Sequence, residues 1–127
     1  MSIRRVVSNI TSTRMEESRE FYTTLFGFEV AMDMGWVITL SSPSNPTAQI
    51  SLVRGDDSVS QGSASQGVGP TISIEVADVD AVHSKALTDG YSVVYPLTDE
   101  PWGVRRFHVT DPNGVILNVL SHGSESP

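Results

Sequence analysis

The sequence contains no cysteine, which excludes disulfide bonds, thiolate metal sites and cysteine nucleophiles. Its longest apolar runs are far too short to span a bilayer. No charged segment followed by an apolar one opens the chain, so we expect no secretory signal. Together these absences predict a cytoplasmic protein that has no membrane segment.

Basic residues are scarce: 8 Lys and Arg stand against 15 Asp and Glu, for a formal net charge of -7. The basic clusters are confined to Arg4-Arg5 and Arg105-Arg106. Because neutralisation of phosphates supplies most of the affinity for nucleic acids, we expect no nucleic-acid partner. The acidic balance fits plain solubility, and attraction of cations is the alternative.

The sequence does contain a repeated order of elements. Its 127 residues are enough for one domain with a core, and 39% apolar content is typical of a globular protein. Each half reads as a strand, a helix and three further strands, which predicts two like modules that share one core. Module one is 3–53, and module two is 70–122. The predicted strands are 4–10, 28–32, 36–40 and 48–53, then 71–76, 91–95, 104–109 and 115–121.

Both predicted helices have recognisable ends. Thr13 and Glu16 fit a capping box at the start of the first helix, and Gly27 ends it. Asp78 is a good N-cap for the second helix, which Gly90 ends. The apolar or small residues that recur at helical spacing predict one buried stripe on each helix. These are Met15, Ser18, Tyr22 and Leu25 in the first helix, and Val79, Val82, Ala86 and Leu87 in the second.

A polar segment rich in glycine and serine, residues 54–69, connects the two modules. It contains Arg54-Gly55-Asp56, a tripeptide known from adhesive proteins. So short a match has a high false-positive rate, and we interpret the segment as a solvated loop.

The stretch 102–122 predicts a hairpin with a tight turn. Asp111 suits the first position of a type I turn, Pro112 presets φ at the second, and Gly114 closes it. A closing glycine in the left-handed region usually adds a bulge to the hairpin.

The bulge decides which residues face each other across this hairpin. With it, His108 lies opposite Asn118 and Arg106 opposite Leu120; without it, Phe107 lies opposite Asn118. We favour the bulged register, because it leaves Phe107 on the same face as the apolar side chains of the last strand.

Side chains alternate along the strands, and each strand has one clean apolar face. We assign that face to packing under the helices. The other face mixes small polar and apolar residues, with less Lys, Glu and Arg than a solvated sheet face would carry. It is typical of a cavity lining. The alternative is a half-exposed sheet face.

Four motifs in this order resemble the vicinal oxygen chelate superfamily, the glyoxalase, bleomycin-resistance and extradiol-dioxygenase group. They are 18–22 (SREFY), 25–28 (LFGF), 101–103 (PWG) and 111–114 (DPNG). The resemblance covers about residues 3–122. It implies an α+β fold of paired βαβββ modules in a single domain, with mixed sheets curled around a central cup. It also implies a homodimer.

Metal-dependent members of that family place His or Glu at four inward strand positions. The corresponding positions here are Val7, Ser51, Thr71 and Asn118. Valine offers no donor, and the other three are weak neutral ligands for a first-row metal. We therefore expect no metal and no cofactor, and the family's usual metal-assisted chemistry is lost with the site.

Several residues on the predicted cup face could still carry chemistry. His108 is the best candidate for acid–base work, since histidine titrates near neutral pH. Glu75 could pair with Arg106 or receive a cationic ligand. We expect His83 to be a surface residue and His122 to be frayed. We assign no catalytic residue.

Trp36 and Trp102 stand at loop–strand junctions, where cup rims are expected, and can stack on flat or cationic ligands. Trp36 lies near two methionines and is the more ligand-like, whereas Trp102 also fits packing at a turn. The predicted ligand-binding residues are Val7, Asn9, Trp36, Gln49, Ser51, Thr71, Ser73, Glu75, Trp102, Arg106, His108 and Asn118.

Two functions are consistent with this pattern. The first is a metal-free small-molecule-binding protein that resembles the bleomycin-resistance members and sequesters a basic or flat aromatic compound. The second is a lyase- or isomerase-like enzyme in which Arg106, His108 or Glu75 transfers a proton without a metal, or in which these residues form an atypical metal site. A structural module with no ligand is a third interpretation.

Overall fold

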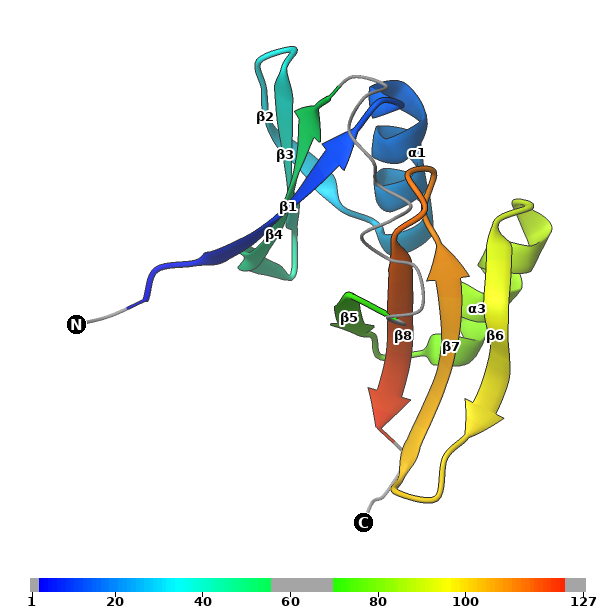
Figure 1. Ribbon diagram of the computed structural model, residues 1–127. Helices are drawn as coiled ribbons and strands as arrows, with labels where there is room; N and C mark the ends of the chain where they lie inside the picture. The colour runs from blue at the N-terminus through cyan, green and yellow to red at the C-terminus, as the bar shows by residue number, and fades with distance from the viewer. Residues whose placement is uncertain (1–2, 56–69, 123–127) are drawn as a thin grey trace. The chain divides into compact units, whose positions relative to one another are not determined.

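A computed structural model describes residues 3–55 and 70–122, which fall into two units, Met1–Ser60 and Gln61–Pro127 (Figure 1). Most of the polar connector, 54–69, lies outside the described residues, and so does Asp56 of the tripeptide. Neither described helix, of 12 and 10 residues, is long and apolar enough to cross a membrane.

The first unit has the predicted order of strand, helix and three strands. Its sheet has the order β1-β4-β3-β2, in which β1 pairs with β4 in parallel and the other neighbours are antiparallel. The elements are β1 (Val6–Ser12), α1 (Met15–Phe26), β2 (Glu29–Asp33), β3 (Val37–Ser42) and β4 (Asn45–Arg54).

The second unit repeats that plan, with the sheet order β5-β8-β7-β6 and a parallel β5–β8 pair. The fold is therefore α+β, built from two βαβββ modules as expected. Its elements are β5 (Ile72–Glu75), α3 (Val79–Thr88), β6 (Ser92–Asp99), β7 (Val104–Thr110) and β8 (Ile116–His122).

β6 runs beyond its predicted end. The prediction placed this strand at 91–95, but the strand continues through Pro96 to Asp99. A proline is tolerated here because β6 is an edge strand, which among the described strands pairs only with β7. Its pairing with β7 also shifts register on either side of Tyr95.

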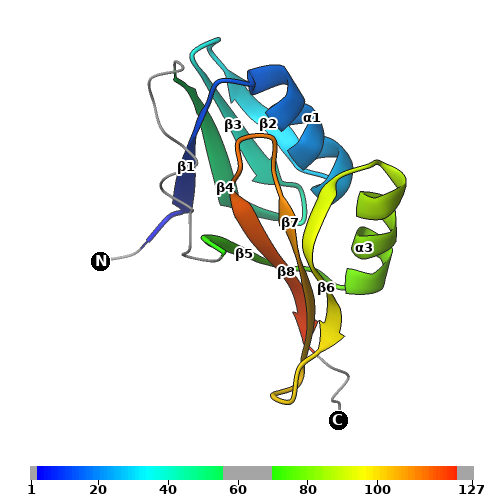
Figure 2. The ribbon, with the colours of Figure 1, turned by 45° about the vertical axis from the view of Figure 1, so that its right-hand side comes forward.

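Each helix covers one face of its own sheet (Figure 2). In the first unit, Phe21 and Tyr22 of α1 are fully buried, with ring centroids 4.9 Å apart in an edge-to-face arrangement. The predicted stripe of Met15, Ser18, Tyr22 and Leu25 is buried. Aromatic rings of this size dominate the apolar area that a small core removes from water.

In the second unit the predicted helix stripe is only partly right. Val79 and Ala86 are buried, but Leu87 is 57% exposed, because the residue after Ala86 is turned by about 100° around the helix. His83 is not a plain surface residue, since its ring lies 5.0 Å from the ring of buried Phe107.

The capping box predicted at α1 is wrong. The helix is capped at Arg14, without a side-chain cap. Instead, the Ser12 hydroxyl accepts a hydrogen bond from the Arg14 amide (3.0 Å) and bonds to the buried Ser18 hydroxyl (3.1 Å). At α3 the predicted cap is confirmed, because Asp78 accepts a bond from the Ala81 amide at 3.1 Å.

The β7–β8 hairpin has the bulged register. Gly114 has φ of 86°, and its amide donates to the Asp111 carbonyl at 3.0 Å. The Asp111 carboxylate accepts from the Asn113 and Val115 amides at 2.8 and 2.9 Å. His108 pairs with Asn118, as that register requires.

Replacing Gly114 with alanine should destabilise the protein by about 1–2 kcal/mol, because a β-carbon disfavours the left-handed region. A Cβ built there meets nothing within 4 Å, so the cost reports backbone conformation rather than a clash. Urea unfolding measures it, and Gly114→Asn is the matched control, since asparagine tolerates this region. Equal losses for Gly114→Ala and Gly114→Asn would contradict the left-handed assignment.

Candidate functional site

A row of polar side chains crosses the sheet of the second unit on the face opposite α3. The row is made by successive register partners: Ser73 pairs with Asn118, Asn118 with His108, and His108 with Tyr95. Because side chains alternate along a strand, these residues point away from the buried face that carries Phe107. The row joins three residues predicted from the sequence with one, Tyr95, that was not.

His108 lies in a partly aromatic environment. Its ring centroid is 4.7 Å from that of Tyr95, and the two planes are tilted by 30°. Its Nε2 is buried and has no hydrogen-bond partner among the described residues. Burial, and then the positive charge of Arg106, lowers the pKa of His108, and Glu100 opposes the shift. The imidazole is thus held neutral at neutral pH.

Asn118 lies directly across the ladder from His108, and one of its two polar side-chain atoms has a hydrogen-bond partner. Its Nδ2 donates to the Ser73 hydroxyl at 3.1 Å. Its Oδ1 is buried and has no partner among residues 3–55 and 70–122. Buried polar atoms are nearly always bonded in folded proteins, so each exception calls for an explanation. Two such atoms, on facing residues, make this the best-supported candidate site.

Beside this row lies a charged and aromatic cluster formed by Tyr95, Glu100, Trp102 and Arg106. Glu100 accepts from the Tyr95 hydroxyl at 2.7 Å and from Arg106 Nε at 2.8 Å. These two bonds lower the pKa of Glu100, and the Glu100 bond raises the pKa of Arg106. The guanidinium lies over the rings of Tyr95 (5.2 Å) and Trp102 (5.5 Å). The charge of Arg106 is therefore already paired with Glu100, and its guanidinium already stacks on both rings.

Sequence reasoning missed Tyr95 and Glu100. The register shifts around Tyr95 hide which way the β6 side chains point, so alternation gave no signal there. Glu100 precedes Arg106 by six residues across the β6–β7 connection. A search for oppositely charged residues that face each other across this predicted hairpin could have found the pair.

Glu75 does not pair with Arg106 as the sequence suggested. It bonds instead to His122 Nδ1, at 2.7 Å, on the exposed end of the β5–β8 pair. His122 is the last residue of β8 and makes this contact, so the expectation that it frays is wrong. Of the three residues considered for proton transfer, His108 alone has a buried side-chain atom without a partner among the described residues.

The first unit has an equivalent polar row of its own. Asn9 pairs with Ser51, and Ser51 with Thr39. The Thr39 and Ser51 hydroxyls bond to each other at 2.8 Å, and both residues are buried. In the next row, Val7 pairs with Gln49, whose side chain accepts from Arg5 at 2.6 Å. This row differs from that of the second unit, because neither Thr39 nor Ser51 has a buried side-chain atom without a partner among the described residues, whereas His108 and Asn118 each have one.

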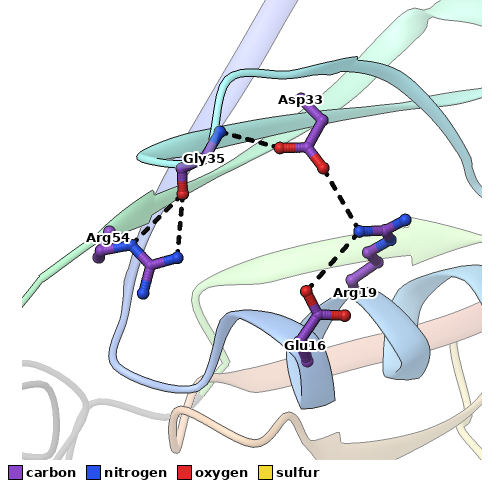
Figure 3. Close-up of polar contacts among 5 residues, drawn as sticks. All are labelled: Glu16, Arg19, Asp33, Gly35 and Arg54. Carbon is purple, nitrogen blue, oxygen red and sulfur yellow. Dashed lines mark hydrogen bonds and ion pairs between the residues drawn. The ribbon is translucent and has the colours of Figure 1, made fainter.

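Trp36 is 59% exposed and follows a turn that is tied to the rest of the unit. The Gly35 amide donates to Asp33 at 2.9 Å, and Arg54 donates twice to the Gly35 carbonyl, at 3.1 and 3.3 Å (Figure 3). Arg19 of α1 lies 3.4 Å from the Asp33 carboxylate. The exposed indole is therefore presented on an anchored hairpin.

An open depression of about 340 Å³ lies on the acidic side of α1. It contains none of the residues predicted to bind a ligand. Its lining is Glu16, Glu17, Arg19, Glu20 and Thr23.

The four positions at which metal-dependent members of the resembled family place their ligands do not fit a metal here. In the described residues, no group of three or more His, Asp or Glu side chains could hold a metal ion. Asn118 bonds to Ser73 rather than to Thr71, which pairs through its amide with the Ile116 carbonyl. Val7 has no donor atom, and Ser51 bonds to Thr39. We therefore derive no step through a metal.

Comparison with known proteins identifies the architecture. A family model described as the Glyoxalase/Bleomycin resistance protein/Dioxygenase superfamily matches residues 3–119. No curated protein matches the chain.

Solved structures similar to the chain share its fold. TnmS3, an antibiotic binding protein from Streptomyces sp. CB03234, is 20% identical with a TM-score of 0.77, covering 97% of this chain and 99% of its own. TioX from Micromonospora sp. ML1 is 22% identical with a TM-score of 0.73, covering 93% and 98%. A Sphaerobacter thermophilus member of the same superfamily is 21% identical with a TM-score of 0.73, covering 95% and 98%.

The lowered pKa of His108 predicts a pH dependence of stability. Below the ordinary histidine pKa of 6.5, the unfolded chain binds a proton that the folded chain takes up only at lower pH. Stability should therefore fall as pH drops from about 7.5 to about 5.5. The melting temperature of His108→Gln should fall less than that of the unmodified protein over this range. A parallel fall in both proteins would contradict a depressed pKa.

Proposed function

The chain belongs to the glyoxalase/bleomycin resistance protein/dioxygenase superfamily, and we propose that within it the protein binds a small molecule without a metal and sequesters it. The proposed ligand is a flat aromatic compound of the kind that antibiotics include. One observation carries the proposal: the facing atoms His108 Nε2 and Asn118 Oδ1 are buried without partners among the described residues, and the Tyr95 ring lies beside His108.

The surroundings of this atom pair support binding rather than catalysis. A catalytic base needs a second group to orient it or to stabilise charge, and Arg106 and Glu75 are bonded to other residues. Ligand pockets combine apolar and aromatic walls with a few polar atoms that fix orientation, and this face has that composition. The similar structure TnmS3, which is named as an antibiotic binding protein, agrees with this choice.

The proposed ligand-binding residues fall into two groups. In the second unit they are Ser73, Glu75, Trp102, Arg106, His108 and Asn118, to which we add Tyr95 because it is the register partner of His108. In the first unit they follow its own polar face and the Trp36 turn: Val7, Asn9, Gln49, Ser51 and Trp36. Thr71, just before β5, completes the set.

Tryptophan fluorescence tests the proposal, because the chain has 2 tryptophans. The variant Trp36→Phe leaves Trp102 as the single reporter, next to Arg106 and the candidate site. Titration with a panel of planar aromatic compounds should quench it saturably, and adding His108→Ala should weaken the apparent affinity about threefold to tenfold, the worth of one hydrogen bond.

A panel in which no compound quenches Trp102 would count against the proposal. Metal analysis of the purified protein gives an independent check, for which we expect well under one equivalent of transition metal. One full equivalent of bound metal would overturn it.

We also propose that the protein is a homodimer, which rests on the family resemblance. Light scattering on the purified protein should then give twice the chain mass of 13.7 kDa. A mass of one chain at micromolar concentration would contradict it.

A further inference from the structure

We propose that the second unit recognises an uncharged planar aromatic ligand through a single hydroxyl group, held between Asn118 Oδ1 and His108 Nε2. This rests on the proposed function and narrows its ligand class, because it favours a neutral hydroxylated compound over a basic one.

The two unpartnered atoms have complementary roles. Asn118 Oδ1 is an acceptor, since its amide nitrogen is used on Ser73. A neutral imidazole carries one N–H, so His108 Nε2 can donate. A hydroxyl group donates one hydrogen bond and accepts others, so one hydroxyl satisfies both atoms at once. An ether oxygen can satisfy only the donor, and a bare ring satisfies neither.

The spacing allows a shared group. His108 and Asn118 are direct partners in the antiparallel register of β7 and β8. Side chains at such positions start from β-carbons about 4.5–5.5 Å apart and rise from the same face. The two atoms bond neither to each other nor to any other described residue, and both are closed to solvent, so a ligand hydroxyl reaches them only when a covering side chain moves.

The charged residues near the His108–Asn118 pair disfavour a cationic ligand. Arg106 lies two residues from His108 on the same face, and its guanidinium already covers the Tyr95 and Trp102 rings on which a cationic drug would stack. Glu100, the carboxylate that could attract a cation, is bonded to Arg106 and Tyr95 and is only 9% exposed. A cationic ligand would have to displace Arg106 from contacts that are already made.

The aromatic side chains near the pair favour a flat ligand. The His108 and Tyr95 rings are within 30° of parallel, and the Trp102 residue is 63% exposed. Flat aromatic groups stack on such surfaces in offset or edge arrangements.

Three two-ring probes of similar size separate the possibilities: 2-naphthol, 2-methoxynaphthalene and the cation N-methylquinolinium. Calorimetric titration of the unmodified full chain should give an affinity for 2-naphthol about threefold to tenfold above that for the methoxy analogue, which is the worth of one hydrogen bond. N-methylquinolinium should bind most weakly of the three.

Asn118→Leu keeps the side-chain shape but removes the acceptor, so it should abolish the preference for 2-naphthol over its methoxy analogue. His83→Phe is the matched control: His83 lies against Phe107 on the opposite face of the sheet, and its substitution should leave all three affinities within about twofold. The probe comparison on the unmodified protein tests the inference even if Asn118→Leu fails to fold.

The outcomes separate this inference from the proposed function. Equal affinities for 2-naphthol and 2-methoxynaphthalene, or tightest binding of N-methylquinolinium, would overturn the hydroxyl inference and leave small-molecule binding intact. A preference for 2-naphthol that persists in Asn118→Leu would also overturn it. Failure of all three probes, together with an unquenched Trp102 in the wider panel, would overturn both.

Discussion

The arrangement of the candidate site depends on the register of one hairpin. Side chains alternate with a period of two, so a shift of one residue between β7 and β8 would send His108 and Asn118 to opposite faces. Gly114, with φ of 86°, supplies the extra residue of the bulge, and Asp111 holds the turn with its carboxylate. The same register places Phe107 and Val119 together in the core. Site and core are thus set by one turn.

The fold and the faces of its strands could be predicted because they depend on short-range signals. Turn residues at Asp111–Gly114, the left-handed end of α1 at Gly27 and the alternation along β8 all report local backbone preferences. The β6 strand could not be read in this way, because two register shifts interrupt its alternation and its proline is tolerated only at an edge. Its contribution to the site, Tyr95, was missed for that reason.

Other misses came from competition between equally good local partners. Thr13 and Glu16 match a capping box, but Ser12 lies where its hydroxyl reaches the Arg14 amide and the Ser18 hydroxyl, and both serines are fully buried. Glu75 and Glu100 were both possible partners for Arg106. In the structure, Arg106 pairs with Glu100 across the β6–β7 connection, and Glu75 bonds to His122. A sequence gives the candidates for such contacts, but three-dimensional proximity selects among them.

The two polar rows have diverged in a way that bears on how the protein could evolve. In the first unit, Thr39 and Ser51 complete each other's hydrogen bonding, so that row adds to the stability of its own sheet. In the second unit, His108 and Asn118 each have a buried atom with no partner in the part of the chain that the structure describes, which lowers the stability of the fold. Selection for stability alone would replace such residues by apolar ones of similar shape. If the proposed ligand is what keeps this polar pair, a lineage that no longer met it would be expected to lose the pair early, while the hydroxyl pair of the other repeat persisted.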